Sequence, residues 1–203
     1  MTRDQLLQAL RRRGLDPAVL AAVADVPREA FVPPGARDRA WEDCALPIGA
    51  GQTISQPSLV AHMVELLELR PADRVLDVGT GSGYHAAILA ALAAHVWSVE
   101  RHADLSRTAA AALAGAGVAN VTLVVGDGSL GLPGEAPFDA INVAAATGKS
   151  VPPVLEEQLA LGGRMVVPVG GAAQYLVLTR RTAEGFERSR LEPVRFVPLV
   201  QGG

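Results

Sequence analysis

The sequence lacks the features that mark secreted, membrane-spanning and metal-binding proteins. Cys44 is the only cysteine, so no disulfide can form within the chain; we expect a cytoplasmic protein in which this thiol is packed rather than nucleophilic. No hydrophobic run reaches membrane-spanning length, and the polar N-terminus does not indicate a signal peptide. We expect no metal site, because the four histidines have no ligand-like spacing: His62, His85, His95 and His102.

A large excess of charge of one sign is also missing. The formal net charge is −3, and the 18 basic residues are scattered apart from Arg11, Arg12 and Arg13, which we assign to a solvated helix end. We therefore expect neither a nucleic-acid partner nor a membrane partner. A hydrophobic fraction of 49% is enough for one sizeable core, and no linker or repeat divides the 203 residues. We expect a single domain, residues 1–203, acting as a monomer.

The most informative segment runs from Arg74 to Tyr84. Its apolar residues Val75, Leu76 and Val78 predict a strand of a parallel sheet that is covered on both faces. The glycines that follow allow a tight turn and leave no Cβ between the backbone and a ligand: Gly79, Gly81 and Gly83. A helix starting after this turn would direct free N–H groups toward it, so we expect a site for a nucleotide-type cofactor.

Two acids at later strand ends narrow the choice of cofactor. Glu100 closes the strand 95–99, about 20 residues beyond the first glycine, where a doubly wound sheet places an acceptor for ribose hydroxyls. Asp127 lies between two glycines, the second being Gly128, and suits a contact to an adenine amino group. Tyr84 stands where a dinucleotide fingerprint requires glycine, which disfavours a dehydrogenase. The combination resembles the cofactor site of class I S-adenosylmethionine-dependent methyltransferases.

The remaining pattern predicts how the elements are arranged. Residues 1–70 indicate a mainly helical segment that covers substrate and cofactor, irregular at 33–51 and helical at 55–69. Residues 71–203 indicate a Rossmann-like α/β core. Strands and helices alternate within it to about residue 169, which predicts a doubly wound, mostly parallel sheet. Runs without helix-length connections predict antiparallel C-terminal edge strands: 165–169, 175–179 and 190–197.

Several segments beyond the glycine turn are similar to one methyltransferase family. Residues 52–57 and 194–199 are the specific ones, whereas the glycine turn is shared by many methyltransferases. Other matches lie at 26–32, 46–51, 65–69, 75–84, 98–101, 126–128, 137–141, 168–170 and 174–176. On these segments the chain resembles the protein-L-isoaspartate O-methyltransferases, which repair damaged proteins.

The resemblance implies methyl transfer from S-adenosylmethionine to the free α-carboxylate of L-isoaspartyl residues in peptides and proteins. The ester cyclises to a succinimide, which hydrolyses in part to normal aspartate. In the family the serine matching Ser55 is the active-site residue, and we expect its hydroxyl to orient the substrate carboxylate; its alternative role is to cap the following helix. The resemblance also adds Thr53, Ile54 and Gln174 to the cofactor site, although Gln174 equally suits a structural amide.

The predicted chemistry agrees with the lack of an obvious acid–base constellation. A carboxylate with a pKa near 4 is ionised at neutral pH and needs no general base. The protein then has to align the carboxylate oxygen with the methyl group and its sulfur, and to exclude water.

Three positions depart from the family pattern and bear on the substrate pocket. Ser58 replaces a bulky residue, Asn142 replaces an aliphatic one, and Thr147 stands where proline is usual. Two alternatives therefore remain open: a carboxyl methyltransferase for one dedicated peptide, and a cofactor-binding module without activity. Methylation of a base amino group is disfavoured, because the segment from Asn142 lacks the Asn/Asp-Pro-Pro-aromatic motif of such enzymes.

Overall fold

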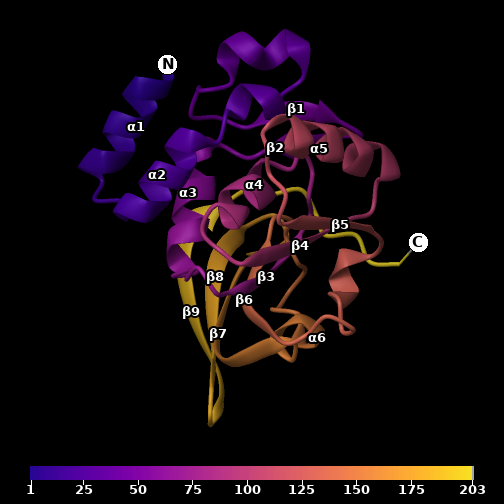
Figure 1. Cartoon of the computed structure of the whole chain (residues 1–203). Coiled ribbons are helices and arrows are strands. Elements are labelled where there is room, and N and C mark those ends of the chain that lie inside the picture. Colours follow the sequence, from indigo (N-terminus) through magenta and orange to yellow (C-terminus); the bar gives the residue numbers. More distant parts are fainter. Residues whose placement is uncertain (203) are drawn as a thin grey trace.

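The computed structural model describes residues 1–202 and is organised around a seven-stranded sheet with the order β5-β4-β3-β6-β7-β8-β9. The first five strands in this order are parallel, and β8 and β9 continue the sheet antiparallel. The predicted fold class is thereby confirmed. The strands are β3 (Arg74–Val78), β4 (His95–Glu100), β5 (Val121–Val125), β6 (Phe138–Val143), β7 (Leu159–Gly170), β8 (Gln174–Thr182) and β9 (Gly185–Val194). The last three form the long orange and yellow ribbons in Figure 1.

Helices cover the sheet on both faces. They are α1 (Arg3–Arg12), α2 (Pro17–Asp25), α3 (Pro57–Leu66), α4 (Tyr84–Ala90), α5 (Ala103–Gly115) and α6 (Pro153–Glu156), with 3-10 turns η1 (Arg28–Phe31), η2 (Pro34–Arg39) and η3 (Gly128–Leu130). Side chains alternate between faces along a strand. Val75 accordingly packs in the cluster that holds α1 to α4, and Leu76 in the cluster that holds α6. No helix in the described part of the chain could cross a membrane.

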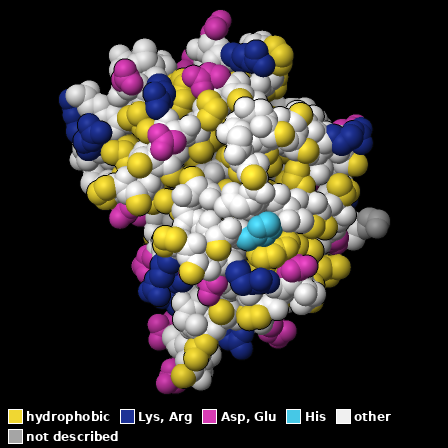
Figure 2. All heavy atoms as spheres, viewed as in Figure 1, with side chains coloured by type: hydrophobic (Ala, Val, Ile, Leu, Met, Phe, Trp, Pro, Cys, Tyr) yellow, Lys and Arg dark blue, Asp and Glu magenta, His cyan; other side chains and the backbone are white. Residues whose placement is uncertain are grey.

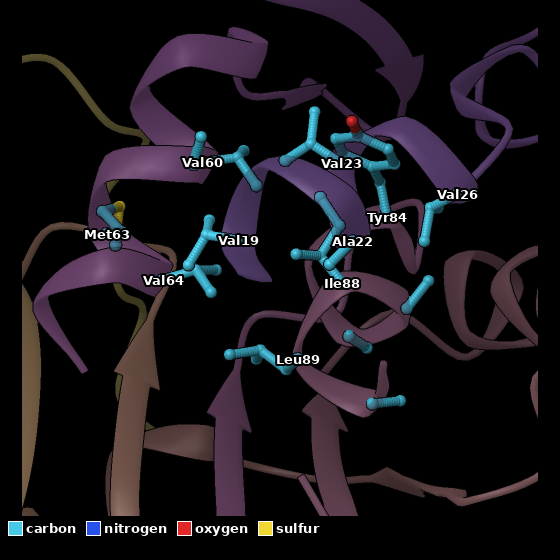
Figure 3. Packing of buried hydrophobic residues seen from close by; sticks show 14 of the residues in the cluster. Val19, Ala22, Val23, Val26, Val60, Met63, Val64, Tyr84, Ile88 and Leu89 are labelled. Carbon is cyan, nitrogen blue, oxygen red and sulfur yellow. The ribbon is translucent and has the colours of Figure 1, made fainter. Parts of the chain in front are cut away.

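The N-terminal helices share their core with the sheet. Figure 3 shows Val19 and Val23 of α2, Met63 of α3, and Ile88 and Leu89 of α4 directed into one cluster. Each of these side chains is at most 6% exposed. Truncating one, as in Met63→Ala, would cost about 2–5 kcal/mol of unfolding free energy. The N-terminal helices are therefore held by the same packing as the sheet.

The structure corrects the predicted elements in three places. The stretch 33–51 is not irregular throughout: it contains η2 and β1 (Leu46–Gly49), which pairs antiparallel with β2 (Gln52–Ile54). Both strands are short and β1 contains a proline, so neither shows a clear alternating pattern. Helix α3 begins at Pro57 rather than at residue 55. Strand β9 covers Gly185–Val194 rather than 190–197, because a tight hairpin after β8 starts it earlier.

The surface shown in Figure 2 carries positive and negative side chains interspersed with hydrophobic ones. The C-terminal segment returns to the sheet: the amide of Leu199 donates to Ala146 O at 2.7 Å, and the amide of Gly202 donates to Asp127 Oδ2, just after β5, at 2.7 Å. This return brings residues 197–200 to the carboxyl ends of the parallel strands, where ligands of doubly wound sheets bind.

Candidate active site

A cleft lies at the carboxyl ends of β3, β4 and β6. Its floor and walls come from the glycine turn, from the end of β4, and from the returning C-terminal segment. The lining residues are Gln52, Thr53, Val78, Gly79, Gly81, Val99, Glu100, Arg101, His102, Gly128, Ala144, Ala145, Val197, Pro198, Leu199 and Val200. We call it the cofactor cleft.

The glycine turn depends on backbone conformations that other residues adopt at a cost. Gly79 has φ +94° and Gly81 has φ +53°, both in the left-handed region. The turn is fastened to the next strand, because the amide of Gly79 donates to Val99 O at 2.9 Å. The glycine turn therefore exposes main-chain groups, with no side chain in front of them, to a ligand that lies across the turn.

Glu100 connects the turn to the end of β4. Its Oε2 accepts from the amide of Gly81 at 2.9 Å, and its Oε1 accepts from the amide of His102 at 2.9 Å. The side chain is 6% exposed, so both bonds fix it firmly. A carboxylate can accept about four hydrogen bonds. One position on each oxygen therefore remains for a pair of ligand hydroxyls, which suits a ribose.

The third strand end supplies Asp127 and Gly128. A Cβ on Gly128 would lie 2.7 Å from Cγ1 of Val78, so only glycine fits against the first strand here. Asp127 Oδ1 accepts from the amide of Ser129 at 2.9 Å, and Oδ2 accepts from the amide of Gly202 at 2.7 Å. Hydrogen bonding from Ser129, and then from Gly202, lowers the pKa of Asp127, so the carboxylate stays ionised and available as an acceptor.

Four predicted cofactor residues are not among the lining residues of the cofactor cleft: Ile54, Gly83, Asp127 and Gln174. Ile54 lines a neighbouring cleft, and Asp127 directly precedes the lining residue Gly128. Gly83, with φ +88°, begins α4, and a Cβ there would lie 3.2 Å from Cβ of Ala109, so this glycine permits α4 to approach α5. Gln174 Nε2 donates to Phe196 O at 3.1 Å, and its Oε1 accepts from the amide of Phe196 at 2.6 Å. Gln174 therefore holds the C-terminal segment that lines the cleft instead of lining it.

Ser55 lies in a second, adjoining cleft. We call it the reaction cleft; its lining residues are Thr53, Ile54, Ser55, Val60, Gly79, Thr80, Gly81, Ser82, Tyr84, His85 and Ala144. Thr53, Gly79, Gly81 and Ala144 line both clefts, so the two clefts are neighbours. The N-cap of α3 is Gln56 and no side chain caps the helix, which excludes capping as the role of Ser55. Its hydroxyl makes no hydrogen bond to any of residues 1–202.

Ionisable groups that could act as a base at neutral pH are missing from the described lining of the reaction cleft. Burial lowers the pKa of His85 to about 3, and burial raises the pKa of Tyr84 to about 12. Both side chains are therefore neutral at pH 7. Such a cleft can align and desolvate reactants, but it does not remove a proton from them.

Arg28 is a contributor that the sequence did not reveal. The side chain is completely buried, with its Nη2 donating to Ser55 O at 2.8 Å and its Nε donating to Ala40 O at 2.7 Å. Its guanidinium also lies 4.6 Å from the centre of the Tyr84 ring. Arg28 thus fixes the backbone of the Ser55 loop through a hydrogen bond from the protein interior. The only signal was its place in a segment shared with the methyltransferase family.

The three departures from the family pattern lie in different surroundings. Asn142 is buried inside the sheet, where its Nδ2 donates to Asp77 Oδ1 at 2.7 Å. Thr147 is buried as well, and its hydroxyl donates to Pro168 O at 3.2 Å. Neither lines the two clefts. Ser58 lies beside Gln56 in a groove next to the reaction cleft, so it alone of the three faces a space that a substrate could reach.

Comparisons with known proteins agree on one family. The family model described as protein-L-isoaspartate(D-aspartate) O-methyltransferase matches residues 1–203. A protein-L-isoaspartate O-methyltransferase of Methylorubrum populi is 54% identical, covering 98% of this chain and 95% of its own, and one of Roseiflexus castenholzii is 52% identical, covering 98% and 92%.

Solved structures give the same result. A protein-L-isoaspartate O-methyltransferase structure matches with a TM-score of 0.87 and 30% identity, over 100% of this chain and 66% of that one. A Plasmodium falciparum protein assigned to the same activity, in complex with S-adenosyl-L-homocysteine, matches with a TM-score of 0.85 and 25% identity over 100% of both chains. The chain belongs to the protein-L-isoaspartate(D-aspartate) O-methyltransferase family.

Proposed function

We propose that the protein transfers a methyl group from S-adenosylmethionine to the free α-carboxylate of L-isoaspartyl residues in damaged peptides and proteins. The observation that supports this most directly is the unpartnered hydroxyl of Ser55, in a cleft whose described lining offers no base and that shares lining residues with the cleft of Glu100. The names of the relatives support repair over a dedicated-peptide enzyme or an inactive binding module.

The cofactor cleft fits S-adenosylmethionine by the chemistry of its donors and acceptors. Glu100 would accept from the ribose hydroxyls, and the glycine turn would run under the methionyl part. Asp127 would accept from the adenine amino group beside Gly128. Thr53 and Ile54 would cover the junction of the two clefts. When bound, S-adenosylmethionine supplies an electrophilic methyl group on a sulfonium centre.

The substrate side has to align a nucleophile that is already ionised. Ser55 Oγ would donate to one oxygen of the isoaspartyl carboxylate and leave the other free for attack. Arg28 acts through Ser55 by fixing its carbonyl, and we assign it a positioning role. Tyr84 and His85 remain neutral and form a buried wall, which limits the access of water.

The partners and setting are part of the proposal. The substrates would be isoaspartyl peptides and proteins, without nucleic acid or membrane. The protein would act as a monomer with a single domain. The lone cysteine supports a cytoplasmic location.

The test uses purified protein, methyl-labelled S-adenosylmethionine and two peptides that differ only in isoaspartate against aspartate. Base-labile label in the isoaspartyl peptide alone is the expected result. Equal labelling of both peptides would contradict the proposed substrate. No labelling of either, with S-adenosylhomocysteine binding demonstrated by calorimetry, would indicate the inactive module or a dedicated substrate instead.

A further inference from the structure

A groove opens beside the reaction cleft. Gln56 and Ser58 line it, directly after the Ser55 loop, and the opposite wall is formed by the end of β9. The complete lining is Arg13, Gln56, Ser58, Leu59, His62, Glu192, Pro193, Val194 and Arg195. A peptide whose isoaspartyl residue reached Ser55 would bring its neighbouring residues close to this groove, because Gln56 and Ser58 follow Ser55 in the chain.

The charges in the groove are unbalanced. Its one acid, Glu192, is engaged by His62, whose Nε2 lies 2.9 Å from the carboxylate. Arg13 and Arg195 are exposed and line the groove, and neither side chain makes an ion pair or hydrogen bond with another residue in the range 1–202. They come from the C-cap of α1 and from the segment after β9. Two unpaired cations thus face the same space from opposite ends of the chain.

We propose that this groove holds the residues flanking the lesion and that Arg13 and Arg195 make the enzyme prefer flanks with acidic side chains. The proposal rests on the proposed function and names the class of substrate that this site accepts best. Charge complementarity at an exposed site acts mainly on encounter and binding, and salt screens it. The preference should therefore appear in KM rather than in kcat, and it should fade at high ionic strength.

The experiment compares three isoaspartyl peptides that differ only at the two residues on each side of the lesion, which are Glu, Gln or Lys. Gln matches Glu in shape without its charge. At low salt we expect kcat/KM to fall from Glu to Gln to Lys, with about tenfold between the extremes. At about 0.5 M salt, where the Debye length is only a few Å, the three values should converge.

Charge reversal provides the decisive variant. The double variant R13E/R195E should invert the order of the Glu and Lys peptides while leaving kcat for the Gln peptide close to that of the parent protein. Arg12→Glu is the matched control: Arg12 is exposed and adjacent in the chain, but it does not line the groove. The Arg12→Glu variant should keep the parent protein's preference for the Glu peptide over the Lys peptide.

The outcomes separate this inference from the function on which it rests. Equal kcat/KM for all three peptides, or the same shift in Arg12→Glu as in the double variant, would overturn the preference while the methyltransferase assignment stands. No methylation of any peptide, including the neutral one, would overturn the assignment and the inference together.

Discussion

The cofactor side and the substrate side of the active site are built in different ways. The cofactor side consists of backbone turns at consecutive strand ends, tied together by Glu100 through two main-chain amides. The substrate side depends on Ser55, whose loop is held by Arg28 from 27 residues earlier in the chain. One side is set mainly by backbone turns at strand ends, and the other depends on a contact with a single buried side chain. Changes on the two sides should therefore have separable effects.

Glu100→Ala should have the largest effect and should act on cofactor binding. Hydrogen bonds to a charged acceptor are worth about 1.5–3 kcal/mol each, so loss of two ribose contacts should weaken S-adenosylhomocysteine binding by about 100-fold or more. Isothermal calorimetry measures this directly.

Glu100→Gln serves as the control for shape in that experiment. It retains one carbonyl acceptor, so its affinity should lie between those of the parent and the alanine variant. Unchanged affinity in Glu100→Ala would remove this residue from the cofactor site and with it the proposed contrast between the two sides.

Ser55→Ala should give the reverse pattern. Removing one hydrogen bond to a carboxylate should lower kcat by about 10–100-fold, while the dissociation constant of S-adenosylhomocysteine stays within about twofold of the parent value. Single-turnover methylation of an isoaspartyl peptide, together with calorimetry, would show both. Full turnover in this variant would leave Ser55 without a role, because the structure already excludes helix capping.

Arg28→Lys should sharpen the contrast by acting on the substrate side from a distance. Lysine keeps the charge but cannot donate to Ser55 O and Ala40 O in the fixed fork of a guanidinium. We expect kcat to fall by about tenfold through a loosened Ser55 loop, with cofactor affinity retained.

Arg39→Lys is the matched control for that variant. Arg39 is exposed and, among residues 1–202, forms an ion pair with Glu42 alone, so its replacement should leave both constants unchanged. A loss of cofactor affinity equal to the loss of kcat in Arg28→Lys would indicate general unfolding, and a thermal melt would show it as a lowered Tm.

How far the sequence could predict each side follows from the same contrast. The glycine turn, Glu100 and the parallel sheet are encoded in short patterns, as is the capping box of α1, in which Thr2 and Gln5 each accept from the other's main-chain amide. These features need only local information, because backbone conformation and strand ends determine them.

Features that depend on distant contacts could not be predicted in this way. The role of Arg28 requires knowing that two carbonyls meet it in the core, and an arginine in a sequence is expected to be exposed. The resemblance leaves Gln174 open between a cofactor contact and a structural amide, and its amide bonds to Phe196, a partner 22 residues away. Asn142 raised doubt about the substrate pocket, although it bonds to Asp77 inside the sheet.

Asp127→Asn should have the smallest effect on the cofactor side, because the Asp127 side chain is shared between the proposed adenine contact and a hydrogen bond from the C-terminal segment. Asp127 Oδ2 already accepts from the amide of Gly202, so the adenine amino group would share an acceptor with the C-terminal segment. Asparagine would present an NH₂ group to one of these donors, and we expect S-adenosylhomocysteine affinity to fall only about fivefold.

A more specific measurement uses S-inosylhomocysteine, which has a carbonyl in place of the adenine amino group. The parent protein should bind this ligand less tightly than S-adenosylhomocysteine, and Asp127→Asn should narrow the difference, because its NH₂ group can donate to that carbonyl. An equal loss of affinity for both ligands would mean that Asp127 holds the C-terminal segment and does not contact the adenine base.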